Sequence, residues 1–229
     1  MSARITVIPT SHIARESSRL IREAIGRERP DCIAVELDEN RLRALKEGEA
    51  SAWYALRTLG PLTFIFYFVL KNIQQSLGKA VGISPGSEML EAVSAGRQEG
   101  IRVALIDRDI GETFLGIKAI PAKEKVRLLS FLLMALVGLG PKQPGKINLA
   151  KVPPEQVVDA ALGLLKKEFP WLYRILIEER DAHMARRILE LSQTCQNIVV
   201  VVGAGHAKGI REILEKKQEP SFSYSFTAD

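Results

Sequence analysis

The chain has 229 residues, of which 46% are apolar and 26% are charged, values typical of a folded globular protein. This composition excludes a wholly disordered chain, a collagen and a disulfide-stapled miniprotein. The 32 Lys and Arg residues outnumber the 27 Asp and Glu residues, but the charges are interspersed, which indicates a solvated surface. Aromatic residues make up only 6% of the chain, which disfavours a surface that stacks on single-stranded nucleic acid. We therefore expect no nucleic-acid partner.

The sequence predicts four short strands, at residues 4–8, 31–37, 101–106 and 197–202. The second and fourth are almost continuous apolar runs, as expected for strands covered on both faces of a sheet. Segments with helical periodicity alternate with these strands, so we predict an α/β fold with a mainly parallel central sheet flanked by helices. The tail at residues 221–227 alternates aromatic residues with Ser and Thr, which predicts a C-terminal edge strand.

Long helical stretches separate the later strands. The expected helices are at residues 13–28, 47–78, 87–98, 122–139, 154–166, 173–193 and 210–217. Structureless loops of such length are uncommon in folded domains. We therefore predict one domain, residues 1–229, with helical insertions at about 47–99 and 110–194.

Two apolar runs, at residues 61–70 and 128–140, are too short for a membrane-spanning helix, which needs about 20 apolar residues. We expect a buried helix for each. Two alternatives stay open, because both runs are apolar on every side. One is attachment to a membrane surface, and the other is a homodimer through these apolar helices.

The two cysteines, Cys32 and Cys195, stand in apolar contexts and have no metal-ligand spacing. We interpret them as reduced, buried residues of a protein in a reducing compartment. The first residues show no secretory signal. The predicted location is therefore the cytoplasm, with the membrane face as an alternative.

Polar residues follow all four predicted strands: His12 after the first, Glu36 at the end of the second, Asp107 after the third and His206 after the fourth. In an open parallel sheet, ligands bind beyond the carboxyl ends of the strands. Two imidazoles and one or two carboxylates suit a divalent ion such as manganese, cobalt or zinc. Without a metal, the same side chains would hold loops through hydrogen bonds, and spacing alone leaves both interpretations open.

Residues 203–209, Gly-Ala-Gly-His-Ala-Lys-Gly, form a predicted loop after the fourth strand. Their third glycine falls one place too late for a dinucleotide-binding fingerprint, and no acidic residue follows at the required distance. We interpret the glycines as allowing a sharp turn at the strand end. The following helix N-terminus is a candidate anion site.

The helical segment at residues 177–183 contains Arg180. One interpretation is an exposed helix with salt bridges along its surface. The other directs Arg180 inward, to hold a carboxylate or an anionic group of a substrate.

Six segments together resemble the TraB/PrgY (pheromone shutdown) family, and in particular its archaeal branch. They are Pro-Thr-Ser-His at 9–12, Val-Glu-Leu-Asp-Glu-Asn-Arg at 35–41, Pro-Gly-Ser-Glu-Met-Leu at 85–90, Ala-Leu-Ile-Asp-Arg-Asp at 104–109, Glu-Glu-Arg-Asp-Ala-His-Met at 178–184 and Val-Gly-Ala-Gly-His at 202–206. The resemblance covers nearly the whole chain. It extends more distantly to Tiki-type metalloproteases and to GumN-like and erythromycin-esterase-like proteins.

In the Tiki group, a paired G-x-x-H motif is tied to metal-dependent peptide cleavage. By resemblance, His206 takes one of these histidine roles, and His12 takes the other, with Pro9 in place of the usual glycine. Glu36 and Arg41 match further motif positions of the family.

Asp107 and Arg180 match motif positions as well. The resemblance thus implies a metal-dependent, peptidase-like hydrolase acting on a peptide or related amide substrate. His12 and His206 would be metal ligands, and Glu36 a ligand or general base. Asp107 would bind the metal or orient a histidine, and Arg180 or Arg41 would fix an anionic group of the substrate.

Two other functions stay open. The first is a non-catalytic protein that binds or sequesters a peptide, or a membrane-associated regulator of the pheromone-shutdown type. The second is a metal-free esterase in which a strand-end histidine and Glu36 act as acid and base.

Overall fold

The computed structural model describes residues 3–10, 15–47, 86–136 and 155–218. Within them, four parallel strands form one sheet in the order β1-β4-β2-β3. The strands are β1 (Arg4–Thr10), β2 (Cys32–Val35), β3 (Arg102–Leu105) and β4 (Asn197–Gly203). The predicted α/β fold and all four predicted strands are confirmed. β4 is central in the sheet, whereas the edge strand predicted at 221–227 lies outside the described residues.

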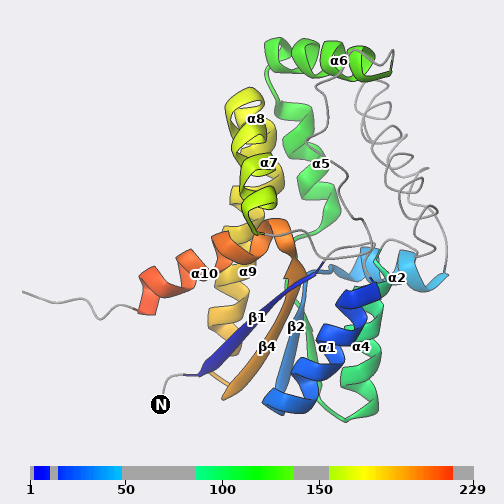
Figure 1. The fold of residues 1–229 in the computed structure, drawn as a ribbon, viewed down its shortest axis with the longest axis vertical. Coiled ribbons are helices and arrows are strands. Elements are labelled where there is room, and N and C mark those ends of the chain that lie inside the picture. The colour runs from blue at the N-terminus through cyan, green and yellow to red at the C-terminus, as the bar shows by residue number, and fades with distance from the viewer. Residues whose placement is uncertain (1–2, 11–14, 48–85, 137–154, 219–229) are drawn as a thin grey trace, which may run out of the picture.

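Helices cover both faces of the sheet (Figure 1). On one face lie α1 (Arg15–Glu28) and α4 (Ser87–Gln98). On the other lie α9 (Glu179–Leu191) and α10 (Ala204–Gln218). The short α2 (Glu39–Glu47), which the sequence did not predict as a separate helix, follows β2. Because α4 and α9 pack directly on the sheet, both predicted insertions contribute to its covering layers.

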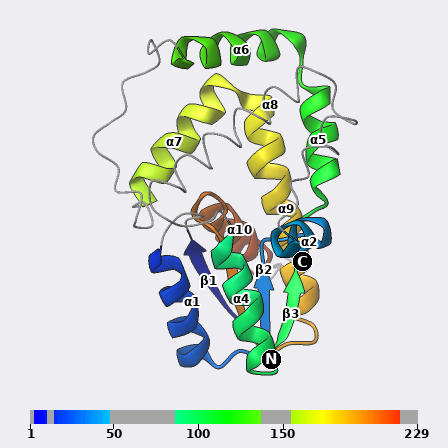
Figure 2. The ribbon, with the colours of Figure 1, turned by 90° about the vertical axis from the view of Figure 1, so that its right-hand side faces the viewer.

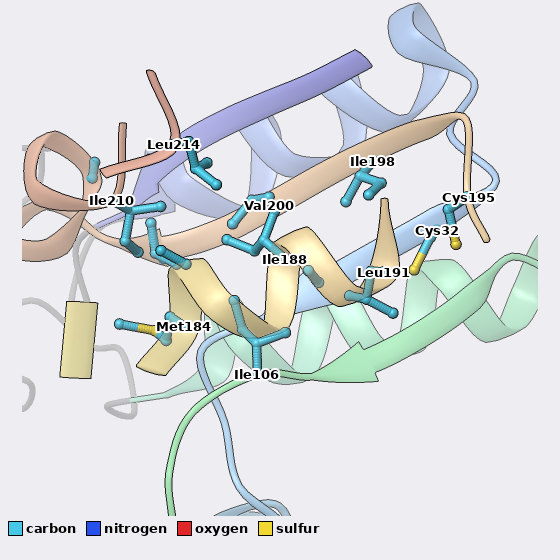
Figure 3. Close-up of a cluster of buried hydrophobic side chains, with 14 residues drawn as sticks. Cys32, Ile106, Met184, Ile188, Leu191, Cys195, Ile198, Val200, Ile210 and Leu214 are labelled. Atoms are coloured by element: carbon cyan, nitrogen blue, oxygen red, sulfur yellow. The ribbon is translucent and has the colours of Figure 1, made fainter. Parts of the chain in front are cut away.

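The core owes its two-sided packing to the alternation of side chains along β4. Val200 and its alternate neighbours point toward Ile188 of α9 and Ile210 of α10 (Figure 3). Val199 and Val201 join Ile21 of α1 on the opposite face. These side chains are fully buried, so the near-continuous apolar run at 197–202 correctly indicates a strand covered on both sides.

A helical lobe extends beyond the carboxyl edge of the sheet (Figure 2). It consists of α5 (Ile110–Ala119), α6 (Ala122–Leu136), α7 (Glu155–Glu168), α8 (Pro170–Tyr173) and a π-helical turn (Arg174–Glu178) that runs into α9. Its apolar cluster is small: Ile117, Ile120, Phe169, Leu172 and Ile175. Of these helices, the sequence did not predict α5, and α8 lies almost wholly before the helix predicted at 173–193.

The structure describes only one of the two apolar runs, and only part of it. The run at 61–70 lies outside the described residues. The described part of the run at 128–140 is helical, as predicted, but it is only partly buried: Leu128 packs on the small cluster of the lobe, whereas Met134 is 51% exposed. Of the helices in the described ranges, none combines the length and the apolar character needed to cross a bilayer.

Cys32 and Cys195 are free and buried, as predicted. The fold also brings them side by side at the far end of the sheet (Figure 3). Burial, together with the hydrogen bond to Cys195, raises the pKa of the Cys32 thiol to about 12. Cys32 is therefore protonated at neutral pH and behaves as a small apolar side chain.

Candidate active site

Three of the predicted site residues meet at the carboxyl edge of the sheet. Glu36 directly follows β2, Asp107 comes two residues after β3, and His206 lies in the first turn of α10. All three side chains are buried, and Glu36 is only 1% exposed. Burying ionisable groups is costly unless charges and hydrogen bonds compensate them, so this cluster needs internal partners.

The predicted loop at 203–209 is wrong. β4 passes directly into α10, which begins at Ala204, so His206 is fixed by a helix instead of a loop. The glycines at 203–209 do not form a sharp turn either. Among the described glycines, positive φ angles occur at Gly86 and Gly100.

Arg180, on α9, lies at the centre of the cluster. Its Nε and Nη2 donate to the two carboxylate oxygens of Asp107 at 3.1 and 2.7 Å, and Nη2 also donates to Oε1 of Glu36. Its Nη1 lies 3.0 Å from Nε2 of His206. The interpretation that Arg180 points inward to hold a carboxylate is therefore confirmed, and it holds two.

Charge compensation explains how this arrangement tolerates burial. Burial alone would lower the pKa of Arg180, but the negative charges of Glu36 and Asp107 outweigh it and raise that pKa. Arg41 adds a second positive charge, since its Nη1 donates to Oδ2 of Asp107 at 2.8 Å. Arg41 thus supports the carboxylate that orients Arg180.

Glu36 ties two strand ends together. Its Oε2 accepts the backbone N–H of Gly203 at 2.6 Å, while its Oε1 pairs with Arg180 and lies 3.5 Å from Nε2 of His206. The end of β2 is thereby linked to the end of β4, at the point where α10 begins. Glu36 positions both the arginine and the histidine-bearing helix.

Asp181 is a site residue that the sequence analysis missed. Its Oδ1 lies 2.6 Å from Nδ1 of His206, and the carboxylate is 4% exposed. An ionised carboxylate only accepts hydrogen bonds, so Nδ1 carries the proton and Nε2 keeps its lone pair, which accepts from Arg180. Burial raises the pKa of Asp181, against the opposing effect of the hydrogen bond from His206.

The sequence spacing along α9 could have identified Asp181 as a buried residue. Asp181 shares the buried face of α9 with Met184, Ala185 and Ile188, which follow at spacings of three, four and seven residues. A carboxylate on an apolar stripe requires a partner in the core.

The π-helical turn before α9 supplies backbone acceptors to the site. The carbonyl of Leu176 accepts from Nη1 of Arg180 at 3.3 Å, and the carbonyl of Ile175 accepts from Nη2 of Arg108 at 2.6 Å. Arg108 also pairs with Glu179 at 3.0 Å. Wider helical turns of this kind occur frequently at functional sites, and here the turn connects the lobe to the two arginines.

Two atoms of the cluster are spaced as two ligands of one metal ion would be. Two ligands about 2.1 Å from a tetrahedral ion are about 3.4 Å apart, which matches the 3.5 Å between Oε1 of Glu36 and Nε2 of His206. Asp107 binds the other edge of the Arg180 guanidinium. Within the described residues, no group of three His, Cys, Asp or Glu side chains is arranged to hold a metal. His12, the remaining predicted ligand, lies outside them.

A cavity of about 290 Å³ lies beside the first turns of α10, and His206 itself is not part of its lining. Its lining includes Tyr173, Asp181, Gly205 and Gly209, so it reaches the carboxylate behind the imidazole and the helix turn that carries it. Lys208 stands at its rim and pairs with Asp159 of α7 at 2.6 Å. The cavity therefore lies where the helical lobe meets α10.

Comparison with known proteins supports the resemblance over nearly the whole chain. A model of the TraB/PrgY/gumN family matches residues 2–225. An uncharacterized protein of Methanocaldococcus jannaschii is 34% identical over 216 residues, which are 93% of this chain and 53% of that protein. TraB domain-containing proteins of Bos taurus and Homo sapiens are each 26% identical over 242 residues, which cover 92% of this chain and 62% of those proteins. The chain thus spans less than two thirds of the length of these relatives.

Proposed function

The chain belongs to the TraB/PrgY/gumN family, and we propose that it is a hydrolase of a peptide or related amide bond with His206 and Arg180 at its catalytic centre. The observation that carries the proposal is the orientation of His206. Asp181 accepts from Nδ1, so the lone pair of Nε2 faces Arg180 and Glu36 at the carboxyl edge of the sheet. This edge is where α/β proteins place their reactive groups.

His206 supplies the base. In the tautomer set by Asp181, Nε2 can accept a proton from a water molecule as that water attacks a carbonyl carbon. The imidazolium that forms is stabilised by the Asp181 carboxylate across the 2.6 Å contact. Proton transfer by a positioned side chain contributes about 10²- to 10⁴-fold to a rate.

Arg180 supplies the positive charge. Glu36 and Asp107 fix its guanidinium, and Arg41 in turn fixes Asp107. Nη1 is the nitrogen directed at His206. In the proposed complex its hydrogen bond to Nε2 is replaced by one to the carbonyl oxygen that becomes negative when water attacks, which frees the Nε2 lone pair to accept the proton of that water. A donor fixed in advance costs no reorganisation during the reaction, which is the usual basis of oxyanion stabilisation.

The second candidate is the metal-dependent form of the same hydrolase, favoured by the 3.5 Å separation of Glu36 and His206. These two residues, with His12, would hold a manganese, cobalt or zinc ion. Such an ion polarises a carbonyl and lowers the pKa of bound water toward 7. Asp181 would then orient His206 from behind, as carboxylates do for metal-bound histidines.

The experiment compares purified wild type with His206→Gln and Arg180→Lys. The assay incubates each protein with a mixture of unstructured peptides and detects cleavage by mass spectrometry. We expect His206→Gln to lose at least about 10²-fold in rate. His183→Gln on α9 is the matched control and is expected to retain the wild-type rate, because His183 contacts Arg186 and not the cluster.

Elemental analysis of protein purified without chelator separates the two forms. One divalent ion per chain and loss of activity with chelator support the metal-dependent form, whereas chelator-insensitive cleavage supports the histidine base. Wild-type rates in His206→Gln overturn the proposal. Peptide binding without cleavage also overturns it, and favours the non-catalytic, peptide-sequestering function.

A further inference from the structure

Gly209 stands one helical turn after His206 on α10, directly against Asp181. A Cβ atom built on Gly209 would lie 2.1 Å from Oδ2 and 3.0 Å from Cγ of Asp181. No real side chain tolerates the shorter of these distances. An interior helical position normally favours alanine over glycine, so the glycine here needs a local reason.

We propose that Gly209 is a positioning residue: its missing side chain leaves the space in which the Asp181 carboxylate holds Nδ1 of His206. One oxygen of Asp181 contacts the imidazole, and the other occupies the place of the absent Cβ. A single helix therefore carries both the histidine and the clearance for the carboxylate that orients it. The catalytic significance of this arrangement rests on the proposed function, but the geometric claim does not.

The surroundings of Asp181 predict what an added methyl group would do. Asp181 sits on α9, which is packed against α10 through Met184, Ile188 and Ile210, so the helices resist moving apart. The cavity of about 290 Å³ lined by Asp181 and Gly209 offers the displaced carboxylate a place to turn. Gly209→Ala is therefore expected to fold, with Asp181 rotated away from His206.

The direct test is nuclear magnetic resonance of histidine labelled with nitrogen-15, in wild type, Gly209→Ala and the control Gly26→Ala. Gly26 lies in α1, and a Cβ there meets no atom within 4 Å. We expect one tautomer of His206, protonated at Nδ1, in wild type and in Gly26→Ala. Gly209→Ala should show loss of the Nδ1-bound proton signal or a mixture of tautomers. An unchanged His206 spectrum in Gly209→Ala overturns the proposal.

A double-mutant cycle with Asp181→Ala checks the cause. Gly209→Ala alone is expected to lower the melting temperature. In the Asp181→Ala background the clash is absent, so the same change should leave the melting temperature unaltered or raise it, as we also expect of Gly26→Ala. An equal loss in both backgrounds means that Gly209 serves another neighbour, and the proposal fails.

Neither measurement depends on turnover, so failure of the hydrolase proposal and failure of this one are distinguishable. If cleavage is found, Gly209→Ala should lower kcat to the level of Asp181→Asn. A normal kcat with a disturbed His206 spectrum would contradict the catalytic role of the Asp181–His206 pair and leave the positioning geometry intact.

Discussion

The sheet with its covering helices and the helical lobe are built differently. Among the described residues, the two clusters on the faces of the sheet contain 14 and 12 buried residues, whereas the cluster in the lobe contains five. In α7, no described residue is buried. Because local stability follows buried apolar contacts, we expect the sheet with its covering helices to be the rigid part and the lobe to open more easily. Asp181 and His206 lie on α9 and α10, in the part built on the sheet, next to the lobe.

The largest expected effect tests this contrast with a pair of truncations. Ile198→Ala removes a fully buried side chain from the central strand, and should lower the free energy of unfolding by about 2–5 kcal/mol. Leu164→Ala removes a 53% exposed side chain from α7, and should change it by no more than about 0.5 kcal/mol. Urea denaturation of both variants gives the comparison. Similar losses in the two would mean that the lobe contributes as much as the sheet.

A smaller effect is expected from Glu124→Ala, which weakens the lobe alone. The Glu124 carboxylate, on α6, accepts the backbone N–H groups of Trp171 at 3.3 Å and Leu172 at 3.0 Å, at the start of α8. Loss of such an acceptor at a helix N-terminus costs about 0.5–2 kcal/mol. Hydrogen exchange should quicken at the amides of α8 and stay unchanged in β4. Faster exchange in both would show that the two regions open together.

The contrast also explains what could be predicted from the sequence. Strands such as residues 197–202 carry β-branched runs, and α4 was predicted at its observed bounds, 87–98, because its apolar residues follow the helical period. The order of the strands was not predictable, since it depends on contacts such as Thr10 with Val202, 192 residues apart. Local patterns therefore indicate elements, not their neighbours.

The site shows the same limit more sharply. The sequence left Arg180 open between an exposed and an inward orientation, and what decides it is a partner 144 residues away, Glu36. Gly209 was interpreted as part of a turn, and that was wrong: the close approach of Asp181 requires it. A glycine needed for clearance looks like a turn glycine until the opposite side chain is known.

The smallest expected effect concerns His183, on α9 beside the boundary between the two regions. Burial lowers the pKa of His183 below 6.5, and the charge of Arg186, whose Nη2 lies 3.2 Å from Nδ1, lowers it further; Asp107 and Glu112 oppose this. Below pH 6.5, the unfolded chain therefore binds this proton more readily than the folded one. The resulting contribution to stability is complete above pH 6.5 and is lost as the pH falls through the folded-state pKa.

His183→Gln removes this titration without adding a charge. Urea denaturation at a series of pH values should show wild-type stability falling below pH 6.5, and the variant falling less steeply over the same range. The difference between the two curves isolates His183 from other groups that titrate over the same range. Burial is the main cause of the lowered pKa. Parallel curves would therefore mean that α9 opens to solvent around His183 as freely as the lobe does, and that this part of α9 does not belong to the rigid part.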